Sequence, residues 1–284
     1  MLRLVGSRAA RTGAAWCALG RLAGAQVAGI AVDPHMVVLT DARPSGEITV
    51  LNPHATRAEF SVELRFGFAT TDSSGRLIVQ LSDGPDSASA AGWVSAYPAR
   101  FTLGAGSART VRLLARPPAG LADGEYWARL TVHARDAGAA PPDPDPVPGT
   151  VRFTMESATV LPLFYRRGAV STGVDIGAVE ARAANDSIEV RTTLTRTGNG
   201  AFIGLAHLVV RDSSGRTIAS VDRPLAVYRS MRPRWSMAVP PGTTMRGCSV
   251  TLQLSTRRRD VPANLLLPAA SNESVVAMVR DAAR

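Results

Sequence analysis

Short runs in which apolar and polar side chains alternate recur along this chain from about residue 28 onward. Residues 47–51, 60–64 and 111–114 are early examples, and residues that favour turns separate the runs. A period of two is the pattern of a β-strand with one buried face. Many short alternating strands joined by turns predict an antiparallel β-sandwich.

One turn sequence occurs twice. Residues 72–76 read Asp-Ser-Ser-Gly-Arg, residues 212–216 repeat this sequence, and an apolar run follows each copy. Asp and Ser open turns and Gly adopts positive φ, so each copy predicts the tip of a hairpin. The chain has 284 residues, which is enough for two domains of ordinary size. The recurrence therefore favours two sandwiches in tandem.

The predicted fold class is all-β, with two tandem Ig-like β-sandwich domains. The predicted divisions are a signal peptide at 1–25, a first domain at 26–167, a second smaller domain at 168–262 and a tail at 263–284. Within the tail, Val275, Met278 and Val279 share one helical face, with Ser271 or Asn272 as the cap, which predicts a short C-terminal helix.

Residues 141–149 carry a proline at nearly every second position. Proline lacks the N–H group that a sheet ladder needs, so this stretch is not a strand. We interpret it as a hairpin loop inside the first domain, which joins a strand at 124–133 to a strand at 151–165. An interdomain linker is the alternative.

The formal net charge is +9, and all 32 basic residues are arginine. They are scattered along the chain, and only residues 257–259 form a dense run. Nucleic-acid binding requires positive charge gathered on one face or helix, so we expect no nucleic-acid partner.

The first 25 residues contain four arginines and no acidic residue. A short apolar stretch follows Arg11, and residues 23–25 (Ala-Gly-Ala) offer a small-x-small cleavage site, which predicts a signal peptide and a periplasmic protein. No later stretch approaches the roughly 18 apolar residues of a membrane span. After cleavage Cys248 would be the only cysteine, so we expect a buried thiol and no intrachain disulfide.

Nothing in the sequence indicates an enzyme. The four histidines lack the spacing of metal sites: His35, His54, His133 and His207. No nucleophile elbow or phosphate-binding loop occurs. We expect no catalytic residues, no metal site and no cofactor.

Residues 151–157 form the most informative strand. Val151, Phe153 and Met155 alternate with polar residues, and Ser157 is the next residue in phase. The run follows the proline-rich loop and leads into residues 163–166, Leu-Phe-Tyr-Arg. Further upstream, residues 98–112 fit a Pro-x-x-x-x-Leu…Gly…Val-Arg pattern. Together these features resemble the amino-terminal domain of the PapD-like periplasmic pilus chaperones, over residues 28 to about 167.

The resemblance implies that the strand donates Val151, Phe153, Met155 and Ser157 to a pilus or surface-fibre subunit whose own sandwich lacks a strand. Backbone hydrogen bonds give adhesion, and the side chains of one face fill the groove. An outer-membrane usher is a further implied partner, and a second copy could pair with the same exposed edge. The alternative is that this face is buried in the protein's own core.

The resemblance also marks four positions near the domain junction. The family clamps the subunit's terminal carboxylate with two cations, but the corresponding positions here hold Met36 and Pro162, which cannot form a charge-assisted bond. Either a cation nearby in the sequence substitutes (Arg166, Arg167 or His35) or the protein captures no carboxylate terminus. Glu125 and Arg166 match an acid and a base that pair in the family, so we expect them to meet and help fix the angle between the domains.

Two functions follow as expectations. The first is a periplasmic chaperone-like protein that binds pilus or surface-fibre subunits by donor-strand addition through residues 151–157. The second is a structural or adhesive tandem Ig-like protein of the cell envelope without chaperone activity. The alternating strand favours the first, and Met36 with Pro162 favours the second.

Overall fold

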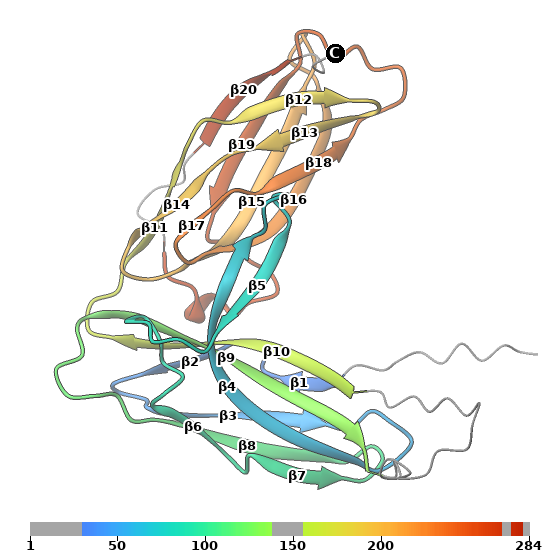
Figure 1. Cartoon of the computed structure of the whole chain (residues 1–284). Coiled ribbons are helices and arrows are strands. Elements are labelled where there is room, and N and C mark those ends of the chain that lie inside the picture. Colours follow the sequence, from blue (N-terminus) through green and yellow to red (C-terminus); the bar gives the residue numbers. More distant parts are fainter. Residues whose placement is uncertain (1–29, 138–155, 269–273, 281–284) are drawn as a thin grey trace, which may run out of the picture.

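The computed structural model describes residues 30–137, 156–268 and 274–280. In these residues the chain folds into β-strands and one single-turn 3-10 helix, η1 (Ala263–Leu265). Two β-sandwiches follow one another along the chain and meet at an angle (Figure 1). We call them domain one and domain two. The predicted all-β class with two sandwiches is confirmed.

Domain one consists of two sheets. The first has the strand order β1 (Ala31–Asp33), β3 (Ser45–Leu51), β8 (Ala108–Ala115), β6 (Val94–Tyr97). The second has the order β2 (Val37–Thr40), β10 (Glu156–Arg167), β9 (Gly124–Asp136), β4 (Ala58–Thr71), β5 (Leu77–Ser82), and β7 (Arg100–Leu103) also pairs with β4. The start of the chain thus switches sheets between β1 and β2.

Domain two also has two sheets. The smaller has the order β11 (Thr172–Ile176), β14 (Leu194–Gly198), β17 (Ser230–Met231). The larger has the order β16 (Thr217–Val227), β15 (Phe202–Arg211), β19 (Ser249–Ser255), β20 (Ser274–Arg280), β12 (Glu180–Ala184), β13 (Ser187–Arg191), β18 (Arg234–Ala238).

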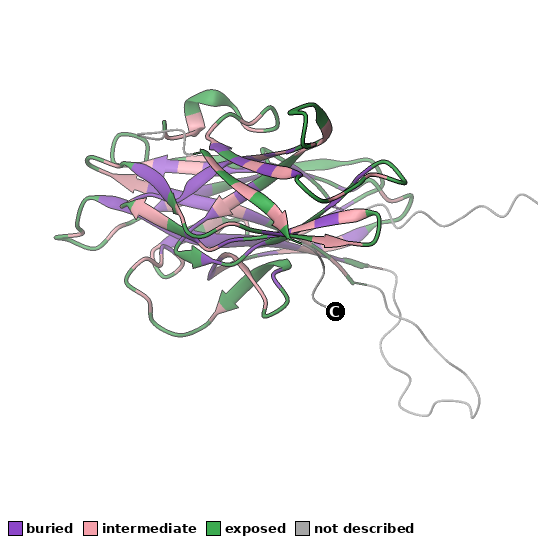
Figure 2. Cartoon of the chain, turned by 90° about the horizontal axis from the view of Figure 1, so that it is seen from above, coloured by how far each residue is buried: buried purple, intermediate pink, exposed green. Residues whose placement is uncertain are grey.

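Each domain has its own core between its sheets, where the buried residues gather (Figure 2). The alternation in the sequence produces these cores, since every second side chain of a strand points inward. Cys248 lies fully buried in the core of domain two, as the sequence predicted.

Both predicted turn repeats are hairpin tips. Residues 72–76 connect β4 to β5, and residues 212–216 connect β15 to β16. In each copy the aspartate carboxylate accepts hydrogen bonds from the backbone N–H groups of the serine two residues later and the arginine four residues later. Gly75 and Gly215 adopt φ near +84° and +83°, which explains the glycine at this position.

The predicted C-terminal helix is wrong. Residues 274–280 form strand β20, which pairs antiparallel with β19 and parallel with β12. The same apolar residues fit a period of two, and Val275, Val276 and Val279 are β-branched, which favours a strand. Pairing on both sides satisfies backbone groups of β20 in the sheet, which a short isolated helix could not match. The proposed cap residues lie outside the described residues.

The sequence predicted that the strand at 151–165 pairs with a strand at 124–133, and the described part of it confirms this pairing. β10 pairs antiparallel with β9 over its whole length, from Glu156 opposite Arg135 to Arg167 opposite Gly124. The proline-rich stretch between these two strands lies outside the described residues.

Candidate functional site

Strand β10 is paired on both sides over only part of its length. On one side β9 covers all of it, whereas on the other β2 pairs only with residues 163–166. Residues 156–162 therefore have one edge that no strand covers in the described part of the chain, and we call this stretch the open edge. The Thr159 hydroxyl donates a hydrogen bond to the carbonyl of Ile30 at 3.2 Å, so the chain passes close to the edge there without forming a ladder.

The two faces of β10 have different surroundings. Leu161, Leu163 and Tyr165 are buried in the core of domain one. Val160, in the opposite phase, is 40% exposed on the outer face. Ser157 is half-buried and lies in the phase of the core residues. Val151, Phe153 and Met155, the other donor positions that the sequence suggested, lie outside the described residues.

Glu125 is the centre of a buried network at the junction of the domains. Its carboxylate accepts hydrogen bonds from Arg166 Nε at 2.8 Å, from Trp127 Nε1 at 3.0 Å and from the backbone N–H of Ala201 at 2.9 Å. The structure thus brings together Glu125 and Arg166, the two residues expected to pair. Because Ala201 belongs to domain two, the same carboxylate also links the two domains.

A second link runs through the segment between the domains. The Asn199 side chain of domain two donates hydrogen bonds to the carbonyls of Ala169 at 2.9 Å and Asp123 at 3.3 Å. Asp123 in turn accepts a bond from the Ala169 N–H. Gly168 has φ near +55°, and an added Cβ would lie about 2.1 Å from the Asp123 carboxyl. A side chain at this position would therefore be strained, which explains the glycine.

Met36 does not point into an open cleft. It is buried in an apolar cluster between the domains, which we call the junction cluster: Met36, Phe66, Phe68, Trp127, Phe164, Ala201, Ile203 and Tyr228. Tyr228 comes from domain two, directly after β16, and its ring lies edge-on to Trp127 at 4.9 Å and stacked on Phe164 at 6.0 Å. At the position where the family resemblance implied a cation, the side chain of Met36 is thus packed among aromatic residues.

Pro162 lies directly opposite Arg129 of β9. Arg129 is only 5% exposed, its guanidinium lies over the Tyr228 ring at 5.1 Å, and its Nε has no hydrogen-bond partner in the described structure. A cation thus lies on the neighbouring strand, opposite Pro162, but the Tyr228 ring covers its guanidinium. Sequence reasoning missed Arg129 because only the ladder register places it beside Pro162.

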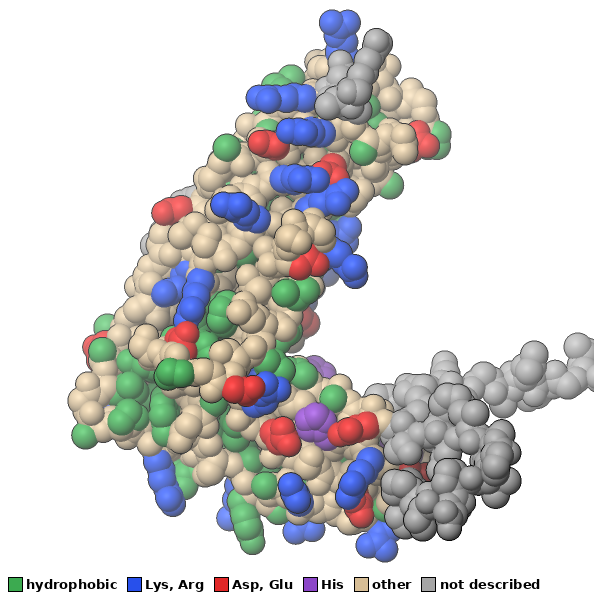
Figure 3. All heavy atoms as spheres, in the orientation of Figure 1, with side chains coloured by type: hydrophobic (Ala, Val, Ile, Leu, Met, Phe, Trp, Pro, Cys, Tyr) green, Lys and Arg blue, Asp and Glu red, His purple; other side chains and the backbone are tan. Residues whose placement is uncertain are grey.

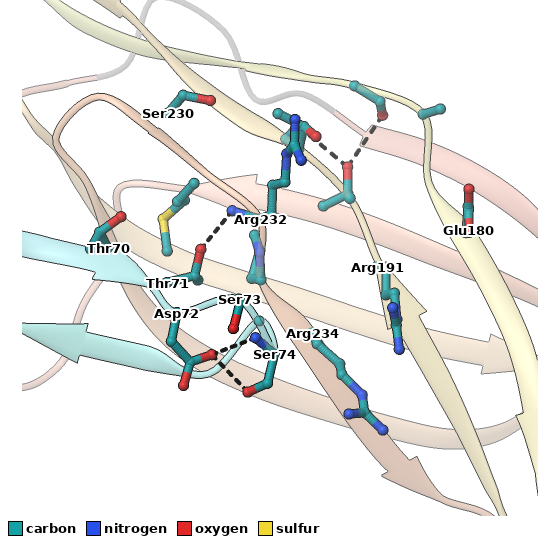
Figure 4. A pocket seen from close by; sticks show the side chains of 17 residues that line it. Thr70, Thr71, Asp72, Ser73, Ser74, Glu180, Arg191, Ser230, Arg232 and Arg234 are labelled. Atoms are coloured by element: carbon teal, nitrogen blue, oxygen red, sulfur yellow. Dashed lines mark hydrogen bonds between the residues drawn. The ribbon is translucent and has the colours of Figure 1, made fainter.

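The tip of the β4–β5 hairpin forms a third contact between the domains. The Arg234 N–H donates to the carbonyl of Gly75, and the Arg232 N–H donates to the Thr71 hydroxyl, both at 2.9 Å. The tip borders an open pocket of about 880 Å³ (Figure 4). Arg191 and Arg234, which line this pocket, both bind the carboxylate of Glu189, so an acid of their own domain offsets part of their charge.

These contacts hold the domains at an angle, and the surface is hollowed between them (Figure 3). Arg229 of domain two and Asp86 of domain one also form an ion pair across the junction, at 2.6 Å. The arrangement therefore presents a concave surface between the domains (Figure 3), and the open edge of β10 lies on domain one.

Burial changes the ionisation of two tyrosines. Burial raises the pKa of Tyr228 to about 12, although the positive charge of Arg129 opposes the shift. Burial, together with the hydrogen bond that the hydroxyl donates to Asp41, raises the pKa of Tyr165 to about 12. In both cases the fold favours the neutral, protonated ring.

These shifts predict a loss of stability in alkaline solution. A tyrosine with an unfolded pKa near 10 and a folded pKa near 12 contributes stability that is complete below pH 10 and is lost as the pH rises through 12. We expect the free energy of unfolding in urea to fall between these two pH values. Tyr228→Phe should reduce the fall, whereas Tyr97→Phe, at a position 79% exposed, should leave it unchanged. Equal falls in both variants would contradict the assignment.

In the part of the chain that the structure describes, no helix is long and apolar enough to cross a membrane. The expected signal peptide lies outside the described residues.

No model of a protein family matches the sequence, and no curated protein matches it. Several solved structures do match. The E. coli chaperone DraB is 14% identical, with a TM-score of 0.41, and the match covers 89% of this chain and 97% of that chain. The YadV chaperone is 12% identical, with a TM-score of 0.44, over 88% and 98% of the two chains.

A third match comes from the CsuC–CsuE chaperone–tip adhesion subunit complex of Acinetobacter baumannii. It is 12% identical, with a TM-score of 0.43, over 90% of this chain and 100% of that chain. Over most of its length, and at low identity, the chain is similar in fold to these solved chaperones.

Proposed function

We propose that this protein is a periplasmic chaperone-like protein that binds pilus or surface-fibre subunits by strand addition along β10. The observation that carries the proposal is the open edge, where residues 156–162 are paired with β9 on one side and with no described strand on the other. An uncovered strand edge offers N–H and C=O groups to a strand of another chain.

The residues that directly precede the open edge have the alternating pattern of a donor strand. Val151, Phe153 and Met155 continue the alternation upstream of Ser157. Burying each such apolar side chain in a subunit's groove would contribute about 1.5–3 kcal/mol, before the cost of ordering is subtracted. Three of them together would contribute about 4.5–9 kcal/mol, to which backbone hydrogen bonds along the strand would add.

In our proposal no carboxylate anchor accompanies the strand. Met36 is packed in the junction cluster, Arg166 is bound to Glu125, and Arg129 is covered by Tyr228. A subunit's terminal carboxylate could reach Arg129 only by displacing the Tyr228 ring. Affinity would then depend on the strand and its side chains, and an usher would be the next partner in assembly.

Charged substitutions in the donor phase test this function. We expect Phe153→Asp combined with Met155→Asp to weaken capture of a strand-deficient pilus subunit, co-expressed in the periplasm, by at least about a hundredfold, because two apolar contacts are lost. Thr154→Asp adds a charge in the opposite phase and serves as the control. Copurified subunit is the readout, and circular dichroism checks the fold.

A structural or adhesive role without chaperone activity is the second candidate. The filled junction favours it, since Met36 holds the position of one anchoring cation and is buried in the junction cluster. If the double variant folds normally and captures the subunit as well as Thr154→Asp does, strand donation through residues 151–157 is excluded. If the unsubstituted protein captures no subunit, the structural candidate remains.

A further inference from the structure

Strand β5 is an outer strand of its sheet with unusual side chains. It pairs only with β4, and its other edge carries no partner in the described chain. Four large apolar side chains on it are exposed: Leu77 (48%), Ile78 (42%), Val79 (50%) and Leu81 (36%). Neither core contains any of these residues.

The hairpin geometry shows which backbone groups of β5 are free. The Asp72 N–H donates to the carbonyl of Arg76, which makes this pair a hydrogen-bonded one. Hydrogen-bonded and non-hydrogen-bonded pairs alternate along an antiparallel ladder, so Ile78, Gln80 and Ser82 direct their backbone groups toward β4. Leu77, Val79 and Leu81 therefore direct theirs outward, to the unpaired edge.

Another outer strand of this protein is protected against pairing. β16 is the outermost strand of the larger sheet of domain two, and its exposed residues 222–224 are Asp, Arg and Pro. Charges and proline on an edge are the usual means of preventing association with another strand. β5 carries neither over residues 77–82, so its edge is free to pair.

The hairpin is also held rigidly. Its tip is fixed to domain two by the bonds from Arg234 to Gly75 and from Arg232 to Thr71. An edge that is already ordered loses little conformational entropy when a strand adds to it.

We propose that β5 pairs with β5 of a second copy of this chain, as an antiparallel two-fold dimer centred on Val79. A two-fold axis perpendicular to the sheet keeps each side chain on its own face, so Val79 meets Val79 and Leu77 meets Leu81 of the other copy. All three residues have outward backbone groups, so each of these pairs is hydrogen-bonded.

The register is self-complementary in its side chains. The face of β5 that carries Leu77 also carries Val79 and Leu81, so this face is apolar in both copies. On the opposite face Ile78 meets Gln80, and just beyond the apolar core Arg76 meets Ser82, so no like charges oppose one another. This symmetry favours a second copy over an unrelated strand. Two short strands form a small contact compared with the about 1,200–2,000 Å² of stable interfaces, so the dimer is reversible.

Substitutions at the centre of the pairing test it by sedimentation velocity over a concentration series. We expect the wild type to shift from monomer to dimer. Val79→Arg alone should raise the dimer dissociation constant at least tenfold, because two arginines would face each other. An equimolar mixture of Val79→Arg and Val79→Asp should dimerise again. Val276→Arg, at a position 63% exposed on β20, is the matched control and should dimerise normally.

Three results would overturn the proposal. They are a wild type that stays monomeric at millimolar concentration, a Val79→Arg variant that dimerises like the wild type, and a mixture that does not recover. A dimer sensitive to Val160→Arg but not to Val79→Arg would place the contact on β10, at the other side of the sheet. Because β10 and β5 are separate edges, this test is independent of subunit capture.

Discussion

Glu125→Ala is expected to lower the free energy of unfolding by about 3–5 kcal/mol, because it removes one partner of a buried ion pair. Arg166 would keep its charge in a site where only 12% of its side chain is exposed. Trp127 Nε1 and the Ala201 N–H would also lose their acceptor, and an unsatisfied buried donor costs about 1–3 kcal/mol. Urea unfolding followed by tryptophan fluorescence measures the loss.

Two variants separate this network from a general effect of removing an acid. Glu125→Gln keeps an acceptor but removes the charge, so its cost should be intermediate. Glu59→Ala breaks the pair with Arg135 on the surface, where both side chains are exposed, and should cost no more than about 1 kcal/mol. Similar losses for Glu125→Ala and Glu59→Ala would show that the junction network contributes little.

The sequence predicted those parts of the fold that depend on local pattern. Alternation identified the strands that became β9 and β10, and the turn chemistry of residues 72–76 identified a hairpin tip. Local pattern failed at residues 274–280, because a few apolar residues satisfy both a helical and a strand period. Pairing with β19, which no local signal reveals, decided between them.

The junction was only partly accessible from the sequence. Glu125 and Arg166 could be matched because the family resemblance covers domain one and implies that these two positions pair. Tyr228 and Ala201 could not, since they come from domain two and meet domain one only after both sandwiches have formed. Arg129 appeared to be an ordinary charged residue of a strand until the ladder placed it opposite Pro162 and beneath Tyr228.

Tyr228→Ala should have the second large effect, because this ring joins the two domains. It contacts Trp127, Phe164 and Phe68 of domain one, and removing a buried aromatic side chain costs about 3–5 kcal/mol. We also expect the domains to move relative to each other. Small-angle scattering should show a broader distribution of shapes, and unfolding should separate into two transitions. Tyr97→Ala, at an exposed position, is the control and should change stability by less than about 0.5 kcal/mol.

The same variant relates the junction to binding. Without the ring, the guanidinium of Arg129 would be uncovered beside Pro162, and a carboxylate could reach it. If Tyr228 only fixes the domain angle, subunit capture should weaken in Tyr228→Ala as the concave surface loses its shape. If Tyr228 instead closes off a cation, capture of a subunit with a free carboxyl terminus should strengthen relative to one whose terminus is extended. Unchanged capture, with the domains shown to be mobile, would mean that strand addition along β10 acts independently of domain two.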